Sequence, residues 1–142
     1  VGVVNPGKIL AESAPAVAAQ NKLKSYFKSR EDELNRRVRA FKDKAGKFEK
    51  DSAVMTESER LSKRRDLAEE EREITRMQRA LLEERNQRAQ EESQIILSRA
   101  NRIIQDLAKS QKYDLILQEA VWASPKVDLT DEVIKRLNKP AK

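Results

Sequence analysis

The stretch FKSREDELNRRVRAFKDKAGKF, residues 27–48, carries apolar side chains at a regular spacing. They follow one another at intervals of seven, four, three, four and three positions: Phe27, Leu34, Val38, Phe41, Ala45 and Phe48. These intervals repeat with the period of an α-helix and place all the side chains along one narrow stripe. The stretch therefore predicts a coiled-coil seam, which requires a second helix as its partner.

A second long helix is predicted from about residue 58 to residue 110. Thr56 and Glu59 have the S/T-x-x-E spacing of a capping box, which starts a helix, and they follow weaker helix formers from residue 51 onward. The expected seam slips by one position between Leu81 and Leu82: Leu67, Ile74, Met77 and Leu81, then Leu82, Ala89, Ile96, Ala100, Ile103 and Leu107. We expect an antiparallel hairpin with a tight turn and a soft spot at Gly46, since glycine weakens a helix interior.

The composition argues against several classes of protein. Of 142 residues, 38% are hydrophobic and 38% are charged, which is too polar for one large compact core. The chain contains no cysteine and no histidine, so disulfides, thiolate and imidazole chemistry and the common soft metal ligands are absent. The acidic residues of 66–73 fit a solvated helix face better than a catalytic site. We therefore expect no enzyme, no cofactor and no metal.

Targeting signals are equally sparse. No stretch approaches the ~18 consecutive apolar residues of a membrane-spanning helix. The start VGVVNPGK lacks the basic end and long apolar run of a signal peptide, so in an exported protein the signal would already have been removed.

Positive charge is concentrated in the first half of the helical region. The formal net charge is +6, and residues 22–65 hold 15 basic and 8 acidic side chains. One basic set converges on the expected turn: Lys42, Lys44, Lys47, Lys50, Arg60, Lys63, Arg64 and Arg65. These cations either belong to ordinary solvated helix faces or form a surface that attracts acidic partner proteins or an anionic membrane.

Four apolar residues also lie near this turn: Phe41, Phe48, Val54 and Met55. They are either seam residues or a sparse apolar lining that contacts partner proteins weakly. A basic coiled coil that binds nucleic acid or anionic surfaces is the alternative function. Acids interleave the bases, however, and the helices lack aromatic stacking platforms, so nucleic acid is not the expected partner.

The two ends of the chain predict a small β body. VGVV (1–4) reads as a strand ended by the turn NPG, and a short helical turn then precedes a helix that begins near residues 13–15. YDLILQ (113–118) and AVWAS (120–124) read as two more strands, and DLTDEVIKRLNK (128–139) reads as a helix with Thr130 as its N-cap. Three short strands and one helix make too small a core to stand alone.

Self-association would supply the missing cover. The alternative is that the apolar residues of the body form an intramolecular core. The residues predicted to form the oligomer interface are Val3, Val4, Leu115, Ile116, Leu117, Val121 and Trp122.

The predicted fold is mainly α with a small β body and a long antiparallel helical hairpin, a coiled-coil arm, projecting from it. Residues 1–14 and 108–142 form the β-rich oligomerisation domain, and residues 15–107 form the arm, with its tip near residues 51–58.

These pieces, in this order, resemble the Skp/OmpH family of periplasmic chaperones. VVNPG is similar to the family's first strand and Asn-x-Gly turn, and FKSREDEL (27–34) is similar to its Phe-Lys-x-Arg-x-x-Glu-Leu stretch. YDLIL and DLTDEVIKRLNK look like its late strand and closing helix.

The resemblance implies a homotrimer in the periplasm, with helical arms that enclose a cavity. Family members hold unfolded outer-membrane β-barrel proteins there without ATP and keep them from aggregating. Anionic membrane lipid or lipopolysaccharide is a further expected partner.

Overall fold

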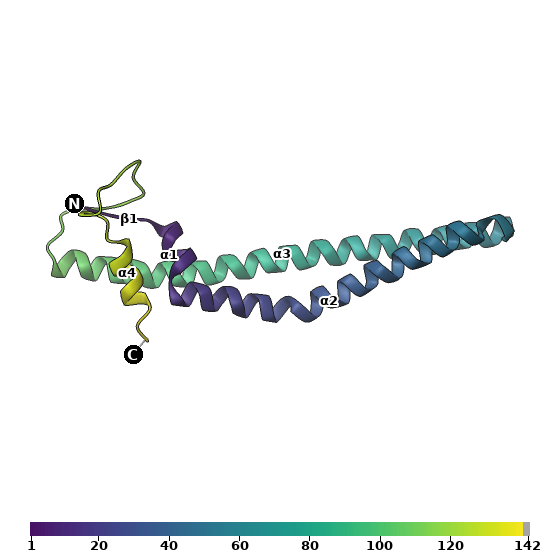
Figure 1. The fold of residues 1–142 in the computed structure, drawn as a ribbon, viewed down its shortest axis with the longest axis horizontal. Helices are drawn as coiled ribbons and strands as arrows, with labels where there is room; N and C mark the ends of the chain where they lie inside the picture. Colours follow the sequence, from purple (N-terminus) through teal and green to yellow (C-terminus); the bar gives the residue numbers. More distant parts are fainter. Residues whose placement is uncertain (141–142) are drawn as a thin grey trace. The chain divides into compact units, whose positions relative to one another are not determined.

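The structure is a computed structural model that describes residues 1–140. Its elements follow the order β1 (Gly2–Val4), α1 (Pro6–Glu12), α2 (Ala14–Asp51), the 3-10 helix η1 (Ser52–Val54), α3 (Glu57–Ser110), β2 (Ile116–Gln118) and α4 (Thr130–Leu137) (Figure 1). A mainly helical chain with a small sheet confirms the predicted fold class. Within residues 1–140, none of the helices has the length and apolar character needed to cross a membrane.

The chain divides into two compact units. The first, called the body, comprises Val1–Lys24 together with the described residues from Gln87 onward. The second, called the hairpin, comprises Ser25–Asn86.

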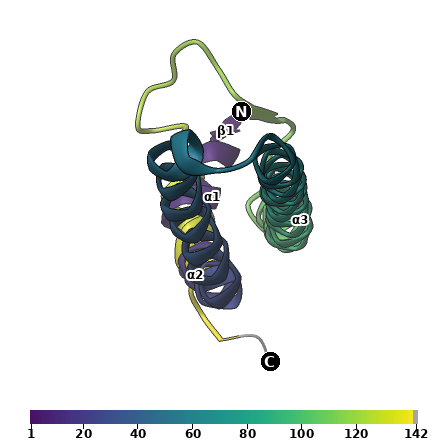
Figure 2. The same cartoon turned by 90° about the vertical axis from the view of Figure 1, so that its right-hand side faces the viewer.

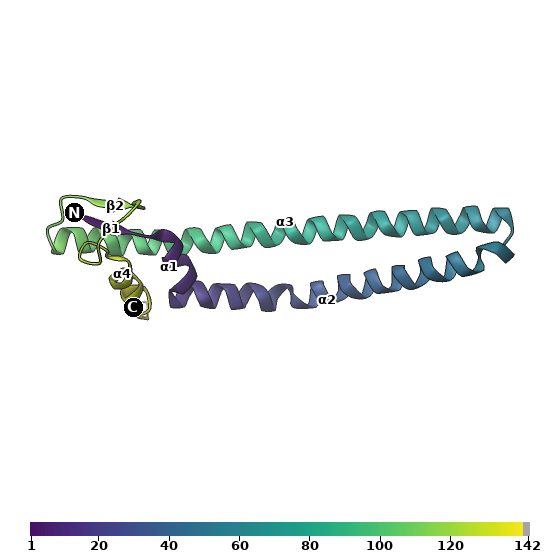
Figure 3. The ribbon, with the colours of Figure 1, turned by 45° about the horizontal axis from the view of Figure 1, so that its top comes forward.

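In the hairpin, α2 and α3 pack along the predicted seam (Figure 3). Phe27 and Leu34 are buried on α2, and Ile74 is buried on α3. The other predicted seam residues of this unit are half-buried: Val38, Phe41, Ala45, Phe48, Leu67, Met77 and Leu81. The regular spacing of apolar residues therefore identified the contact face correctly.

The predicted slip of the seam is present: Ile96 is buried, while Ile95, which continues the register of Ile74 and Leu81, is 60% exposed. The predicted start of the slip at Leu82 is wrong. Leu82 is 60% exposed, and Ala89 is also exposed. Leu81 already occupies the seam, and the next residue of an α-helix is rotated by about 100° away from it. The stripe resumes in the body, where Ile96, Ala100 and Leu107 are buried.

The sheet of the body is built around β1. β1 pairs in parallel with β2, with Gly2 opposite Ile116 and Val4 opposite Gln118. On its other side, the Val3 N–H donates to the Val127 carbonyl at 2.8 Å, and the Leu129 N–H donates to the Val3 carbonyl at 2.8 Å. β1 is therefore central, and the segment before α4 takes the place expected of a third strand.

The predicted strand over residues 120–124 is wrong. These residues belong to an open loop between β2 and α4 (Figure 2). Glu119 has a positive φ of 62°, a left-handed conformation that turns the chain out of the strand directly after β2. The β-prone composition of AVWAS is overridden by this turn and by the pairing of β1 with residues 127–129.

The core of the body forms where α1, α2, α3 and α4 meet. Its buried residues are Val4, Ile9, Ala16, Ile96, Ala100, Leu107, Leu129, Val133 and Leu137. Gly2 lies tightly against this core, because a Cβ there would stand 2.6 Å from the Leu129 Cδ1.

The helix starts confirm two expectations and correct a third. β1 ends before NPG, and the predicted short helical turn follows as α1: Asn5 caps α1 by accepting from the Lys8 N–H at 3.3 Å, and Pro6 occupies the first turn. α2 begins at Ala14 as predicted, and the Ser13 Oγ accepts from the Ala16 N–H at 3.3 Å.

Thr130 is the first residue of α4, not its N-cap. It is buried, and the Asp128 Oδ1 accepts from its N–H at 2.9 Å and from its hydroxyl at 2.6 Å. The Thr130 Oγ1 in turn accepts from the Asn5 N–H at 3.0 Å. The acceptor at this helix start is therefore Asp128, while Thr130 ties α4 to the chain just after β1.

Candidate functional site

The turn of the hairpin is fixed by a set of hydrogen bonds. The predicted capping box is present: the Glu59 N–H donates to the Thr56 Oγ1 at 3.1 Å, and the Thr56 N–H donates to the Glu59 Oε2 at 3.4 Å. The Arg60 Nη1 donates to the Ser52 carbonyl at 2.9 Å and to the Met55 carbonyl at 2.7 Å. Arg60 therefore holds the turn together, which the basic pattern of the sequence did not reveal.

The apolar residues near the turn have different environments. Phe41 and Phe48 are half-buried in the seam, and Met55 is half-buried beside the turn. Val54, by contrast, is 88% exposed. Phe48, Val54 and Met55 line a surface depression at the turn.

Charges of both signs surround this depression. Lys47 and Lys63 line it from α2 and α3, and Asp51 and Glu59 line it close to the turn. The carboxylates make the turn a mixed surface and not a continuous basic one.

The other predicted cations lie along the flanking helices. The Lys44 Nζ lies 3.3 Å from the Glu70 Oε2 and so serves a contact between the helices. The remaining members of the basic set are exposed: Lys42, Lys47, Lys50, Lys63, Arg64 and Arg65.

Farther along the hairpin, two ion pairs join the helices. The Arg30 Nη1 lies 2.6 Å from the Glu84 Oε2, and Arg85 pairs with Glu31. The Arg30 guanidinium also stands over the Phe27 ring, 5.5 Å from its centroid. Partly exposed pairs contribute about 0–1 kcal/mol each, so this seam holds the helices together weakly.

In the body, the predicted interface residues divide into two groups. Val4 is buried in the chain's own core, and Val3 and Ile116 are half-buried. The others are exposed, with Trp122 at 80%: Leu115, Leu117, Val121 and Trp122. Within residues 1–140, β2 has only β1 as a strand neighbour, so Leu117 belongs to a strand with an open edge. Val121 and Trp122 line a depression together with Val3 and Asp128.

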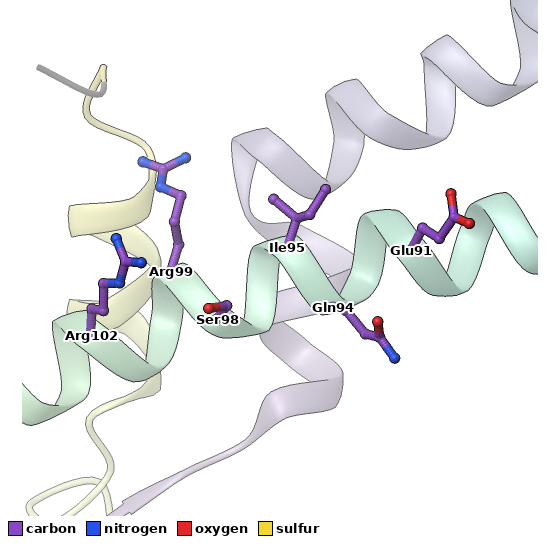
Figure 4. A pocket seen from close by; sticks show the side chains of 6 residues that line it. All are labelled: Glu91, Gln94, Ile95, Ser98, Arg99 and Arg102. Atoms are coloured by element: carbon purple, nitrogen blue, oxygen red, sulfur yellow. The ribbon is translucent and has the colours of Figure 1, made fainter.

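A groove of about 670 Å³ lies on α3 in the body, and the sequence prediction missed it. Figure 4 shows its lining residues, all of which α3 contributes: Glu91, Gln94, Ile95, Ser98, Arg99 and Arg102. The Arg99 Nη2 donates to the Leu137 carbonyl of α4 at 3.4 Å. Spacings of three and four residues around the exposed Ile95 were the signal that could have found this face.

Two side chains at the junction of the chain ends have shifted pKa values. The side-chain hydrogen bond to Asp131 raises the pKa of Lys8, and the hydroxyl and backbone N–H of Thr130 lower the pKa of Asp128. Among residues 1–140, no group of three or more metal-ligating side chains gathers. The candidate surfaces thus consist of apolar side chains and dispersed charges.

Comparison with known proteins identifies the family of this chain. Residues 1–137 match the family described as outer membrane protein (OmpH-like). The chain belongs to the OmpH family. The family predicted from the sequence is therefore confirmed.

Curated relatives of this OmpH-family chain carry the name chaperone protein Skp. The protein from Photorhabdus laumondii is 26% identical over 139 residues, which cover 96% of this chain and 84% of the relative. The protein from Escherichia coli K12 is 25% identical over 140 residues, which cover 96% and 85% of the two chains.

A solved structure shares the fold. It is described as an OmpH-like outer membrane chaperone from Caulobacter crescentus and matches with a TM-score of 0.80 over 96% of this chain and 82% of that one. The two sequences are 18% identical, so this likeness concerns the fold alone.

Proposed function

We propose that this protein is a holding chaperone of the periplasm. It binds unfolded outer-membrane β-barrel proteins and prevents their aggregation without ATP. The observation that carries the proposal is the match of residues 1–137 to the OmpH family, whose curated relatives here are named chaperones.

Weak, distributed contact is the mechanism that these surfaces support. The hairpin offers exposed charges of both signs, a thin apolar seam and a few exposed apolar side chains, of which Val54 is the most exposed. Many weak contacts hold a client by their combined effect, and each is easily broken, so release needs no chemical energy. The three glycines, Gly2, Gly7 and Gly46, are too scattered to form the glycine-rich loop that cradles nucleotide phosphates, which agrees with ATP independence.

The proposed assembly is a homotrimer whose helical arms enclose the client. Leu115, Leu117, Val121 and Trp122 expose apolar surface, and Leu117 belongs to a strand with an open edge in a two-stranded sheet. Sheets this small need further cover, and a second and third copy would provide it. In this proposal residues 1–14 and 108–142 serve assembly, while residues 15–107 form the arm.

The cations flanking the turn also suit anionic membrane lipid or lipopolysaccharide as a second partner. Lys47, Lys50, Lys63 and Arg64 are exposed, and such charges attract an anionic surface less strongly as salt rises.

The proposal is tested by turbidity. A urea-unfolded outer-membrane β-barrel protein is diluted out of denaturant with and without this protein, at about three chains per client, in the presence and absence of ATP. We expect aggregation to be suppressed equally with and without ATP. Unchanged turbidity would reject the holding function, and suppression only with ATP would reject its independence of nucleotide.

A further inference from the structure

Several hydrogen bonds hold the backbone of the hairpin turn. Arg60 binds two carbonyls of the turn through one nitrogen, at 2.9 and 2.7 Å. The Met55 N–H donates to the Ser52 carbonyl at 3.3 Å, and the Ser52 Oγ donates to the Glu49 carbonyl at 3.2 Å. Together with the capping box at Thr56, these bonds fix the backbone on both sides of Val54.

This hydrogen-bonded turn presents an apolar side chain to solvent. Val54 is 88% exposed, more than any other large hydrophobic residue found exposed in the hairpin, where Leu82 follows at 60%. Val54 lies outside the seam, so its exposure is not explained by helix packing. An apolar side chain on a fixed backbone can be buried by a partner with little loss of conformational entropy.

The surroundings of Val54 indicate the kind of partner that would fit. Phe48 and Met55 extend the apolar surface, Lys47 and Lys63 flank it, and Asp51 and Glu59 bring negative charge to the same depression. Strands of outer-membrane β-barrels alternate apolar and polar residues. In an extended segment, successive side chains are about 3.3 Å apart and point in opposite directions, so an apolar residue has polar neighbours close by. An apolar surface with charges of both signs around it complements such a segment.

We propose that the depression at the turn is a docking point for an extended segment of an unfolded outer-membrane β-barrel protein, and that Arg60 is its positioning residue. One apolar side chain of the client packs against Val54 and Met55, and the surrounding charges contact its polar neighbours. This inference rests on the proposed function and adds a contact at the turn itself.

Affinity measurements on the full-length protein test the docking point. A dye-labelled, urea-unfolded outer-membrane β-barrel protein is titrated with wild type, with Val54→Ser and with Leu82→Ser, which removes an exposed leucine elsewhere in the hairpin. We expect Val54→Ser to raise the Kd by about fivefold, the loss of a partly buried apolar contact, and Leu82→Ser to leave it unchanged. An unchanged Kd for Val54→Ser, or an equal increase for both variants, would overturn the proposal.

The role of Arg60 is tested with a matched pair of charge-removing variants. Arg60→Gln and Arg79→Gln, the latter at an exposed position of α3 outside the basic set, each remove one cation, but only the first removes the two bonds to the turn. We expect Arg60→Gln to weaken binding as Val54→Ser does and to speed amide hydrogen exchange over residues 52–56, with Arg79→Gln changing neither. Equal effects of the two variants on the Kd would show that Arg60 acts only by its charge.

A vesicle-binding experiment distinguishes anionic membrane lipid from an unfolded client as the molecule that binds at the turn. The same variants are mixed with vesicles containing anionic phospholipid, and binding is measured by co-sedimentation. Loss of vesicle binding by Val54→Ser with unchanged client affinity would assign the turn to membrane contact and overturn the proposal. A wild-type protein that binds no client would instead reject the holding function itself.

Discussion

At the scale of single residues, Gly2 allows β1 to lie close to the core, because it has no Cβ. A Cβ at this position would stand 2.6 Å from the Leu129 Cδ1 and 3.3 Å from the Tyr113 Cε1. Gly2→Ala should therefore destabilise the protein by about 1–3 kcal/mol, the usual cost of overpacking. Gly46→Ala is the matched control: a Cβ there meets nothing within 4 Å, so this change should stabilise α2 by about 1 kcal/mol. Urea unfolding measures both, and a neutral Gly2→Ala would contradict the packing described.

Asp128 should make the stability of the folded protein depend on pH in the acidic range. Its pKa lies below its ordinary value of 3.8, because the Thr130 hydroxyl and backbone N–H donate to the carboxylate. A carboxylate with a lowered pKa in the folded state contributes stability that is complete above the unfolded pKa and is lost as the pH falls through the folded pKa. Asp128→Asn should therefore reduce the loss of stability below about pH 4.

Thermal unfolding between pH 2 and pH 6 measures this effect, with the exposed Asp106→Asn as the control. Identical acid profiles for wild type and Asp128→Asn would show that Asp128 does not contribute.

Single residues are also where sequence reasoning failed most clearly. Arg60 belongs to a basic set by composition, yet its guanidinium faces the turn carbonyls. Thr130 has the chemistry of a cap, yet it lies inside the helix and accepts from Asn5, which is 125 positions away in the chain. Side-chain direction depends on contacts distant in sequence, which residue types and local spacing do not encode.

At the scale of elements, the capping box determines where α3 begins. Thr56→Ala removes the hydroxyl that accepts from the Glu59 N–H and should destabilise the hairpin by about 1 kcal/mol. Ser62→Ala, in the exposed interior of α3, is the control and should be neutral or slightly stabilising. Urea unfolding followed by circular dichroism compares them, and equal midpoints for Thr56→Ala and wild type would contradict the assignment.

The elements that depend on local signals were predictable. The seam of α2 follows from apolar spacing, and the start of α3 follows from two residues three positions apart. The third segment beside β1 was not predictable, since residues 127–129 lack the β-prone run that AVWAS has. Its pairing is set by the return of the chain from Glu119 to α4.

At the scale of the whole molecule, the single chain leaves part of its apolar surface uncovered. Sequence reasoning identified Val54, Met55 and the set around Trp122 because apolar residues stand out in a polar chain. It did not separate Val4, which the chain buries itself, from Val121 and Trp122, which it exposes. Only the folded structure shows which of these apolar residues are buried and which are exposed. We propose that the exposed group contacts other copies of the chain and that the turn contacts clients.

The central claim is that several copies together hold one unfolded client, and the mass of the complex tests it most directly. Native mass spectrometry of this protein, alone and mixed with an unfolded outer-membrane β-barrel protein, gives the number of chains in each species. The account predicts three chains alone and three chains with one client in the complex. A folded single chain, or a client bound to one chain, would contradict it.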